Sequence, residues 1–411
     1  MGKYGLLGAK LSHSFSKDIH KQIADYDYEL MEMTEDELDM FLREKQFKAV
    51  NVTIPYKKTV IPYLDEMTDA AKAIGAVNCI RNEEGRLIGH NTDFDGMVGL
   101  IRHLGLDLED KKVMILGTGA TSETAYAVCN YLKTSQIIKV SRNAKGGSVS
   151  YEDASIIHGD TSVIINTTPV GMYPNQFEVP MDISRFAGLE GVVDVVYNPL
   201  RTNLILDAME AGLKAKGGLY MLVEQAVKAS EFFLNTKYCS HVTENVFGEM
   251  VSQKENVVLT GMPASGKTTI GKMVAEHLGR PFFDTDQIIE ENVGMPIVEI
   301  FEKYGEKRFR DLETEAIKEV SMKTGAVIAT GGGAILRKEN VKMLKLNGKV
   351  FFVDRSLEKL IPTDDRPTAS SKEQIKQRYE ERYPIYRSTC DHIVYNEKTA
   401  GEAAEEIVKS I

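Results

Sequence analysis

The chain has 411 residues, 43% of them hydrophobic and 27% charged, with a formal net charge of −10 and four widely spaced cysteines. These values are typical of a globular protein of two or three domains, and they argue against non-specific nucleic-acid binding, a disulfide framework and a cysteine-based zinc site. The N-terminus has no apolar signal-peptide core and no apolar run approaches the roughly 18 residues that cross a bilayer, so we expect a cytoplasmic protein without membrane or nucleic-acid partners.

The predicted elements alternate between strands and helices, which is typical of α/β domains with largely parallel sheets. In the first series we expect strands over 3–9, 28–33 and 47–53 and helices over 18–26 and 36–44. In the second we expect strands over 112–116, 136–140, 162–165 and 191–196, and a third series begins at Val257. Residues 240–256 are polar and lose their apolar periodicity after Phe247, so we expect a linker there.

Lys57 follows a proline at the end of a predicted strand, where open α/β sheets place active-site groups. Asp93 lies in a second polar loop. A lysine beside a carboxylate and largely removed from water can polarise a carbonyl and pass a proton. From spacing alone, however, both residues are more commonly solvated charges.

A glycine-rich segment, Gly117-Thr118-Gly119-Ala120-Thr121-Ser122, stands between a predicted strand and a predicted helix. It lacks the third glycine of the dinucleotide-binding fingerprint, so by itself it fits a plain βα turn equally well. The next strand ends in Ser141-Arg142, where NAD-binding proteins carry an acidic residue for the ribose. A guanidinium there suits a 2′-phosphate and favours NADP over NAD, with a simple surface arginine as the alternative.

The segment Gly261-Met262-Pro263-Ala264-Ser265-Gly266-Lys267-Thr268 has the G-x-x-x-x-G-K-T pattern between an apolar strand and a helix. In such a loop the backbone N–H groups bind phosphate oxygens, Lys267 reaches the β/γ-phosphates and Thr268 holds Mg²⁺ through its hydroxyl. A glycine-rich turn that fits the pattern by chance is the weaker alternative.

Asp284 and Asp286 end the next predicted strand, where an i, i+2 pair would project from one side toward the site. One carboxylate could support Mg²⁺ and the other orient a hydroxyl for attack, unless Asp286 only caps the following helix. The arginines over 305–313 fit either a ligand site or a solvated helical face, and the glycines over 331–333 indicate a close backbone approach. The polar stretch Thr363–Lys372 fits a mobile lid.

Seven blocks of the first 248 residues, in the same order, resemble the shikimate dehydrogenase family. They are Ser12–Ser16, Asn51–Lys57, Gly75–Asn78, Asn91–Asp93, Asn166–Met172, Asp194–Leu200 and Gly218–Gln225. The resemblance implies reduction of 3-dehydroshikimate by NADPH, with Lys57, oriented by Asp93, stabilising the alkoxide and supplying a proton. It also implies a substrate domain over 1–92 and about 217–248, and a Rossmann-like NADP domain over about 93–216.

The resemblance further assigns residues to each ligand. Those implied around the substrate are Ser14, Ser16, Thr53, Asn78, Asp93, Tyr197 and Gln225. Those implied around NADP(H) are Gly117, Gly119, Ala120, Ser141, Arg142, Thr167, Met172 and Gly218. The chain differs from the usual family pattern at Lys17, where proline is common, and in the cofactor loop, which usually has the pattern G-x-G-G-A.

Residues 257–411 resemble the shikimate kinase family, whose fold is a parallel-sheet P-loop domain similar to nucleoside monophosphate kinases. The resemblance implies that Asp286 acts on the hydroxyl to be phosphorylated, that Thr268 and Asp284 lie on the Mg²⁺ side, and that Arg366 is the lid arginine. The ATP-binding residues implied are Gly261, Ala264, Ser265, Gly266, Lys267, Thr268, Thr269 and Arg366. The substrate-binding residues implied are Asp286, Arg310, Gly331, Gly332, Gly333 and Arg382. The lid is short, and Thr368-Ala369 follows Pro367 where the family favours leucines.

The sequence therefore predicts α/β structure throughout and a bifunctional shikimate-pathway enzyme that uses NADP(H), ATP and Mg²⁺. The two parts, 1–248 and 257–411, are separated by a linker over 249–256. The alternatives are an NAD-using quinate/shikimate dehydrogenase fused to a weak or non-catalytic P-loop ligand-binding module and, disfavoured by the charge, a nucleic-acid-binding P-loop protein. The oligomeric state is not predicted.

Overall fold

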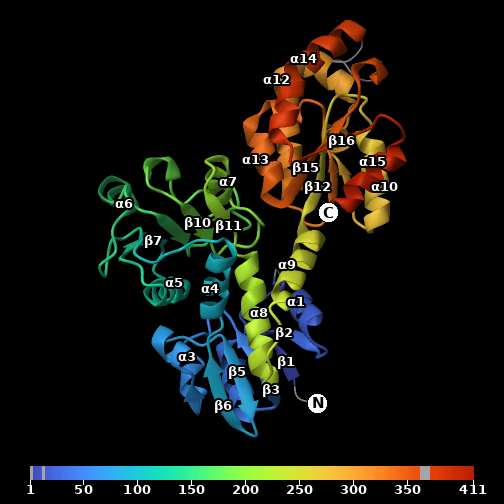
Figure 1. Ribbon diagram of the computed structural model, residues 1–411. Coiled ribbons are helices and arrows are strands. Elements are labelled where there is room, and N and C mark those ends of the chain that lie inside the picture. Colours follow the sequence, from blue (N-terminus) through green and yellow to red (C-terminus); the bar gives the residue numbers. More distant parts are fainter. Residues whose placement is uncertain (1–2, 12–13, 362–370) are drawn as a thin grey trace. The chain divides into compact units, whose positions relative to one another are not determined.

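The computed structural model describes residues 3–11, 14–361 and 371–411, so Ser12, His13, Arg366 and most of the predicted lid lie outside the described residues (Figure 1). The chain forms two compact units, Met1–Met250 and Val251–Ile411, and each is described by itself. Within the described ranges, none of the helices combines the length and apolar character that a membrane span requires. Short 3₁₀ helices are η1 (Ile61–Tyr63), η2 (Ile183–Arg185), η3 (Ala334–Leu336) and η4 (Leu357–Lys359).

The first sheet of the N-terminal unit has six strands in the order β2-β1-β3-β5-β6-β4. Its strands are β1 (Lys3–Gly8), β2 (Tyr28–Glu32), β3 (Phe47–Val52), β4 (Glu66–Met67), β5 (Cys79–Glu83) and β6 (Arg86–His90). Its helices are α1 (Ser16–Ile23), α2 (Glu35–Glu44) and α3 (Asp69–Ile74). Because β5 runs antiparallel to both β3 and β6, this sheet is mixed rather than largely parallel.

The second sheet of this unit is parallel throughout, in the order β11-β10-β9-β7-β8. Its strands are β7 (Lys112–Leu116), β8 (Gln136–Val140), β9 (Val163–Asn166), β10 (Gly191–Asp194) and β11 (Lys214–Lys216). Its helices are α4 (Asp93–His103), α5 (Ala120–Tyr131), α6 (Tyr151–Ile157) and α7 (Asn203–Glu210). The chain passes from β7 to β8 on one side and returns to β9 on the other, so the strand order reverses beside β7. Such a reversal opens a crevice at the carboxyl ends of the strands.

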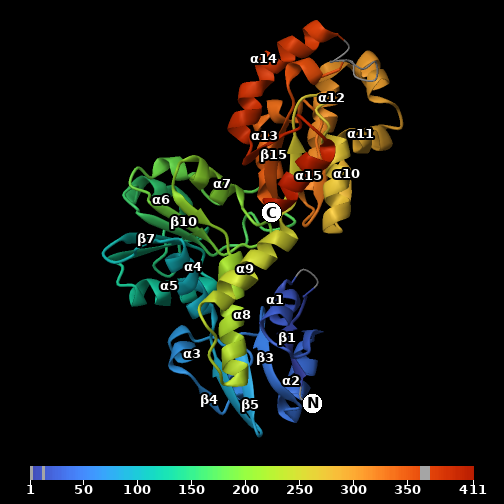
Figure 2. The same cartoon turned by 45° about the vertical axis from the view of Figure 1, so that its right-hand side comes forward.

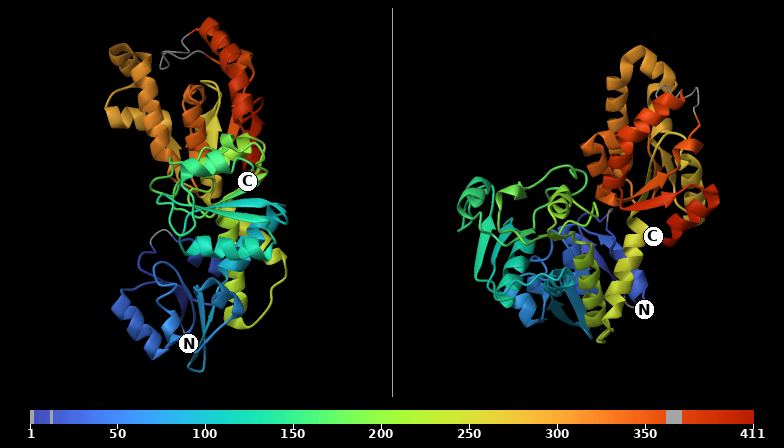
Figure 3. Two further views of the ribbon diagram at one scale, coloured as in Figure 1. Left: turned by 90° about the vertical axis from the view of Figure 1, so that its left-hand side faces the viewer. Right: turned by 45° about the horizontal axis from the view of Figure 1, so that its top comes forward.

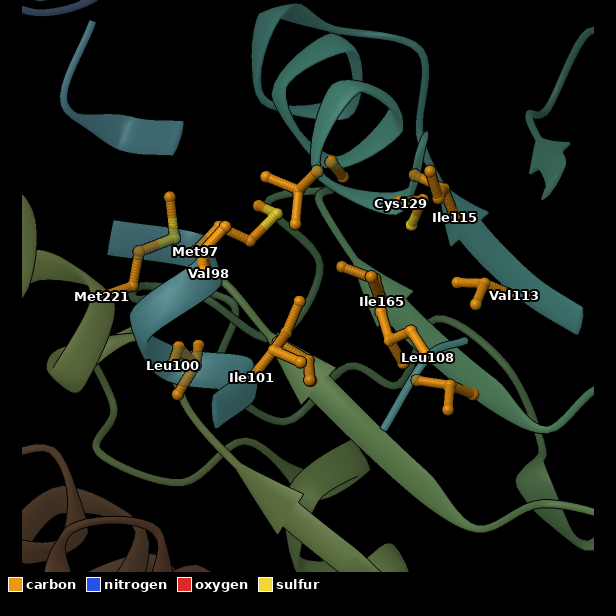
Figure 4. Close-up of a cluster of buried hydrophobic side chains, with 14 of the residues drawn as sticks. Met97, Val98, Leu100, Ile101, Leu108, Val113, Ile115, Cys129, Ile165 and Met221 are labelled. Carbon is orange, nitrogen blue, oxygen red and sulfur yellow. The ribbon is translucent and has the colours of Figure 1, made fainter. Parts of the chain in front are cut away.

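Helix α8 (Leu219–Leu234) joins the two sheets of the N-terminal unit, since it packs on α4 and also contacts β3 and β5 (Figure 3). Figure 4 shows the core beneath it, where Met97 and Ile101 of α4 lie near Ile115 and Ile165 of the parallel sheet. Alternate residues of the same strands, such as Met114 and Ile164, enter a second core on the opposite face. This period of two explains why β7 and β9 are apolar over most of their length.

The C-terminal unit has one parallel sheet in the order β13-β14-β12-β15-β16. Its strands are β12 (Asn256–Thr260), β13 (Phe282–Asp284), β14 (Val327–Ala329), β15 (Gly348–Asp354) and β16 (His392–Tyr395). Its helices are α10 (Lys267–Leu278), α11 (Thr285–Val293), α12 (Ile297–Ser321), α13 (Lys338–Asn347), α14 (Lys372–Thr389) and α15 (Ala400–Lys409). Helices α10 and α15 cover one face, and α12 and α13 cover the other (Figures 1 and 2).

The segment expected to be a linker, residues 240–256, is helical over most of its length. Helix α9 spans His241–Lys254 and buries Val246 and Met250, and β12 begins two residues after the helix ends. The boundary between the two units falls inside this helix. These two apolar positions are four residues apart and therefore share one face of the helix. Because most of the other residues are polar, this spacing is hard to recognise in the sequence.

Candidate active sites

Lys57 and Asp93 form an ion pair in the N-terminal unit. The Lys57 Nζ lies 2.6 Å from the Asp93 Oδ2, and the two side chains are only 17% and 15% exposed. Lys57 lies in the turn after β3, and Asp93 is the first residue of α4, where the helix dipole stabilises a carboxylate. The ammonium group is thus held in place while part of it still faces solvent.

Hydrogen bonds to the carboxylate and to the neighbouring backbone hold Asp93 in place. Asn78 donates from Nδ2 to the Asp93 Oδ1 at 2.9 Å, so Lys57 and Asn78 occupy different carboxylate oxygens. The Asp93 amide donates to Asn91 Oδ1 at 3.0 Å, and the Thr92 amide donates to Asn78 Oδ1 at 2.8 Å. Asn91 and Thr92 were not predicted as site residues, although they belong to the Asn-Thr-Asp block that carries Asp93.

The remaining predicted substrate residues come from several elements of the N-terminal unit. The Thr92 hydroxyl lies 3.5 Å from the Oε1 of Gln225 on α8, and the Ser16 amide donates to Ser14 Oγ at 3.2 Å. The Phe15 ring lies 5.4 Å from the Tyr197 ring, which connects the serine segment to the loop after β10. Burial raises the pKa of Tyr197, so its hydroxyl remains protonated. Thr53 directly follows β3, four residues before Lys57.

The glycine-rich cofactor loop lies between β7 and α5. Gly117 has a φ of 110°, and a Cβ there would come 2.8 Å from the Thr167 Oγ1, so only glycine fits this approach of the two loops. Gly119 caps α5 without a side chain, and the space beside it is open. Ser122, buried in the place of the third glycine, donates to the Gly117 carbonyl at 2.8 Å. The serine therefore stabilises the loop from the position where the fingerprint has its third glycine.

The predicted cofactor residues collect at the carboxyl ends of the parallel sheet. Gly117, Gly119 and Ala120 follow β7, Thr167 and Met172 follow β9, and Ser141 and Arg142 follow β8. The Ser141 hydroxyl lies 2.7 Å from the Ser148 hydroxyl, and the Arg142 side chain is exposed. Gly218 caps α8, and its amide donates to the Val196 carbonyl at 2.8 Å. A helix N-terminus and an exposed guanidinium on one edge suit a phosphorylated dinucleotide.

The phosphate-loop pattern of the C-terminal unit forms the predicted turn between β12 and α10. Gly261, Ala264 and Gly266 all have positive φ values, and Gly266 caps the N-terminus of α10. The buried Lys267 donates from Nζ to the carbonyls of Gly261 and Met262, at 2.9 Å in both cases. Ser265 is buried, whereas Thr268 and Thr269 are exposed in the first turn of α10.

The sequence predicts that Asp284 and Asp286 both end a strand and project from one side of it. In the structure they belong to different elements. Asp284 ends β13 and caps α11, because its Oδ1 accepts from the Asp286 amide at 3.0 Å. Asp286 lies in the first turn of α11, so it is not the helix cap that the alternative interpretation expected. The Thr268 hydroxyl donates to Asp284 Oδ2 at 2.8 Å, which pairs the two side chains predicted for the Mg²⁺ side.

Arg310 lies on the buried side of α12 and not on a solvated face. It donates from Nη1 to Glu313 Oε2 at 2.8 Å and from Nη2 to Glu306 Oε1 at 3.1 Å. Burial raises the pKa of the Glu313 carboxyl, and the charge of Arg310 opposes that shift. Glu313 was not predicted as a site residue, because the sequence does not show that it is buried together with Arg310.

The three glycines after β14 lie close to these charged groups. A Cβ at Gly331 would come 2.5 Å from Asp286 Oδ1 and 2.8 Å from Glu313 Oε1, and one at Gly333 would collide with the Arg310 guanidinium. Arg382, buried on α14, donates from Nη1 to the Gly332 carbonyl at 3.0 Å. Substitution of Gly331 would therefore displace the two acids, and substitution of Gly333 would displace Arg310.

A cavity of about 270 Å³ brings these groups of the C-terminal unit together. The predicted residues that line it are Lys267, Thr268, Asp284, Asp286, Arg310, Gly331, Gly332, Gly333 and Arg382. Arginines on one wall suit a carboxylate, and the acid pair near the phosphate loop suits Mg²⁺ and a hydroxyl. A larger cavity of about 780 Å³ between η2 and α7 includes none of the predicted residues.

Comparisons with known proteins assign each part of the chain to a family. The family model described as shikimate kinase matches residues 263–411, and the model described as the shikimate dehydrogenase substrate binding domain matches residues 6–80. The chain is 36% identical over 264 residues to the shikimate dehydrogenase (NADP(+)) of Clostridium beijerinckii, covering 59% of this chain and 96% of that relative. It is 46% identical over 162 residues to the shikimate kinase of Clostridium botulinum, covering 38% of this chain and 98% of that relative.

Solved structures agree for the N-terminal part. Shikimate dehydrogenase 1 from Peptoclostridium difficile matches with a TM-score of 0.56 and 33% identity, covering 61% of this chain and 98% of that one. A shikimate 5-dehydrogenase from Thermus thermophilus, solved in complex with NADP(H) and shikimate, matches with a TM-score of 0.55 and 26% identity, covering 61% of this chain and 99% of that one.

Proposed function

We infer that this chain, which belongs to the shikimate dehydrogenase family in its N-terminal part and to the shikimate kinase family in its C-terminal part, performs two consecutive steps on one carbon skeleton. It is a bifunctional enzyme of the shikimate pathway, with shikimate dehydrogenase (NADP⁺) and shikimate kinase activities. We propose that the dehydrogenase part comprises residues 1–248, that the kinase part comprises 257–411, and that 3-dehydroshikimate enters the first site and shikimate the second.

In the dehydrogenase site, Lys57 is the proton donor. NADPH, when bound, supplies a hydride to the 3-keto carbon of the substrate. Negative charge then develops on the carbonyl oxygen, where the ammonium of Lys57 stabilises it and transfers a proton. Asp93, held by Asn78, keeps that ammonium oriented, and the partial exposure of the Lys57 side chain lets it regain a proton from solvent.

The loops at the carboxyl ends of the parallel strands β7 to β11 offer suitable contacts for NADP(H). The amides at the start of α5, around Gly119 and Ala120, suit the pyrophosphate, and the exposed Arg142 suits the 2′-phosphate. Thr167 and Met172 follow β9 and would line the nicotinamide side, and Gly218 follows β11 in the same sheet. The substrate's hydroxyl and carboxylate groups would meet Ser14, Ser16, Thr53, Asn78, Tyr197 and Gln225.

In the kinase site, the phosphate loop and Lys267 hold ATP, and Thr268 with Asp284 supports Mg²⁺, since their side chains already adjoin. Asp286 orients and deprotonates the attacking hydroxyl, which takes the γ-phosphoryl group and leaves ADP. Arg310 and Arg382 bind the substrate carboxylate, a geometry that guanidinium groups match with paired N–H donors. The observation that carries this proposal is the convergence of these residues, from separate segments of the chain, on one cavity.

A one-pot reaction tests both assignments. Purified protein is mixed with 3-dehydroshikimate, NADPH and MgATP, NADPH absorbance is followed, and products are identified by mass spectrometry. We expect shikimate 3-phosphate, with shikimate as the transient species. Lys267→Ala should stop the reaction at shikimate with an unchanged rate of NADPH oxidation. Shikimate that accumulates with the wild-type protein would contradict the kinase assignment, and unchanged NADPH would contradict the dehydrogenase assignment.

A further inference from the structure

Tyr386 on α14 contacts, through its hydroxyl, two segments that contribute residues to the kinase cavity. Its ring is fully buried against Phe352, at a centroid distance of 4.9 Å. Its hydroxyl oxygen lies 2.9 Å from the carbonyl oxygen of Gly261 in the phosphate loop and 2.5 Å from the carbonyl oxygen of Gly332 in the glycine segment after β14. The two segments also touch directly, because a Cβ at Gly332 would come 2.8 Å from Pro263.

The Tyr386 hydroxyl has one proton for these two acceptors. Both neighbours are carbonyl oxygens, and a phenol donates only one hydrogen bond. Burial raises the pKa of Tyr386 well above its usual value, so the hydroxyl keeps that proton across the working pH range. The proton therefore points to Gly261 or to Gly332, and the other carbonyl must find its donor elsewhere.

The other donors are the cations proposed to bind the two substrates. Lys267 donates to the Gly261 carbonyl and Arg382 donates to the Gly332 carbonyl. With Lys267 on Gly261, the tyrosine proton is available to Gly332, which is the nearer acceptor. When nucleotide phosphates draw an N–H of Lys267 away, Gly261 keeps a full set of partners only if the tyrosine proton turns to it. A buried acceptor left without a donor is costly, so this turn is favoured.

That turn leaves Arg382 as the donor to Gly332. The existing bond from Arg382 to this carbonyl then no longer competes with the tyrosine proton, and the remaining donors of the guanidinium are oriented for a carboxylate. We propose that Tyr386 is a positioning residue that couples occupancy of the phosphate loop to the carboxylate-binding arginine through its single hydroxyl proton. This inference rests on the proposed kinase function, and its consequence is that bound nucleotide tightens shikimate binding.

Calorimetric titration of the full chain tests the coupling. The dissociation constant of shikimate is measured without nucleotide and with a saturating, non-hydrolysable ATP analogue and Mg²⁺. NADP(H) is left out, and the dehydrogenase site is silenced by Gln225→Ala in every variant so that only the kinase site is titrated. In this background nucleotide should lower the dissociation constant roughly two- to tenfold, the range of one net hydrogen bond. Adding Tyr386→Phe should bring the ratio close to one while each ligand still binds alone.

Tyr383→Phe is the matched control. Tyr383 lies one turn earlier on α14, and its hydroxyl lies 3.1 Å from Asp354 Oδ2 instead of the two carbonyls. This variant should keep the full nucleotide effect. A nucleotide effect that survives in Tyr386→Phe, or that is absent from the protein with an unchanged Tyr386, overturns the inference. Protein that binds neither ligand would instead contradict the kinase assignment itself.

Lys267→Met gives a second test that does not alter the buried ring. Without the lysine, the tyrosine proton should rest on Gly261 permanently, so shikimate should bind without nucleotide about as tightly as it binds the nucleotide-loaded protein. Addition of Tyr386→Phe to Lys267→Met should leave this tighter affinity unchanged, because without the tyrosine proton the Gly332 carbonyl still accepts from Arg382. Shikimate binding by Lys267→Met at the weaker, nucleotide-free affinity would overturn the inference.

Discussion

At the scale of single residues, the chemistry of reduction depends on one ammonium group. We expect Lys57→Ala to lower the rate of 3-dehydroshikimate reduction roughly 10²- to 10⁴-fold, the usual contribution of a positioned acid. The kinase rate of the same preparation should not change. Lys58→Ala, which removes the exposed neighbouring charge, is the control and should keep the dehydrogenase rate. Spectrophotometric assays of both activities would check this, and an active Lys57→Ala protein would exclude Lys57 as the proton donor.

Asp194 and His20 are buried titratable groups in the N-terminal unit. The Asp194 carboxylate accepts from Asn166 and Val196 at 3.0 Å and from Thr202 at 2.7 Å, yet burial raises its pKa from 3.8 to about 7. Burial lowers the pKa of His20 from 6.5 to about 3. Between about pH 4 and 7 the folded state holds a proton on Asp194 that the unfolded state releases, so this term in the unfolding free energy falls as the pH rises. The His20 term has the opposite sign, because stability is lost as the pH falls from 6.5 toward 3.

The two terms can be separated with Asp194→Asn. The amide keeps the size of the side chain but cannot ionise, so the stability of the wild type minus that of the variant should decrease from pH 4 to pH 7 and then level off. Urea unfolding of the N-terminal unit at a series of pH values would measure it. A difference that is constant over this window would contradict the raised pKa of Asp194.

Local sequence patterns identify the reactive residues but not the residues that hold them. Lys57, Asp93 and Lys267 stand in recognisable motifs, and the structure pairs Lys57 with Asp93 and bonds Lys267 to the carbonyl of Gly261. Glu313 and Tyr386 escaped prediction because their partners, Arg310 packed under Gly333 and the carbonyls of Gly261 and Gly332, become neighbours only after folding. Such contacts depend on how the elements pack in three dimensions, and the spacing of residues along the chain does not specify that packing.

At the scale of secondary structure, buried parallel strands are the most predictable elements. The strands over 112–116 and 136–140 have the predicted bounds because both are apolar and are bounded by polar turns. The antiparallel β5 and the helical α9 were missed for different reasons. Strand direction is set by connections and not by composition, and α9 is stabilised by a few buried contacts that outweigh its polar character.

Asp284 combines a helix cap with a predicted Mg²⁺ contact, and two substitutions separate these roles. Asp284→Ala should lower the unfolding free energy of the C-terminal unit by about 1 kcal/mol, the usual effect of losing an N-cap. Asp284→Asn should keep that stability because asparagine caps equally well. Both variants should lose kinase activity and need more Mg²⁺. Thermal unfolding and Mg²⁺ titration of the kinase rate would check this, and full activity of Asp284→Asn would contradict the Mg²⁺ role.

At the scale of the whole molecule, the two compact units should unfold as separate cooperative transitions. Scanning calorimetry should show two transitions, one that NADP⁺ shifts to higher temperature and one that the ATP analogue with Mg²⁺ shifts. A ligand present at one hundred times its dissociation constant should add about 2.7 kcal/mol to the stability of the unit that binds it. Lys267→Ala should abolish only the nucleotide response. A single transition that responds to both ligands would show that the units fold together.

The boundary between the units falls inside α9 rather than in an irregular segment. Proteases cut extended, exposed loops far more readily than helices, so the covalent link should outlast the other exposed connections. Each chain therefore carries one reductase and one kinase for its whole lifetime, in a ratio that translation fixes at one to one. A cell that contains this protein cannot adjust the relative amounts of the two enzymes. Any balance between making shikimate and consuming it must come from their turnover numbers and affinities.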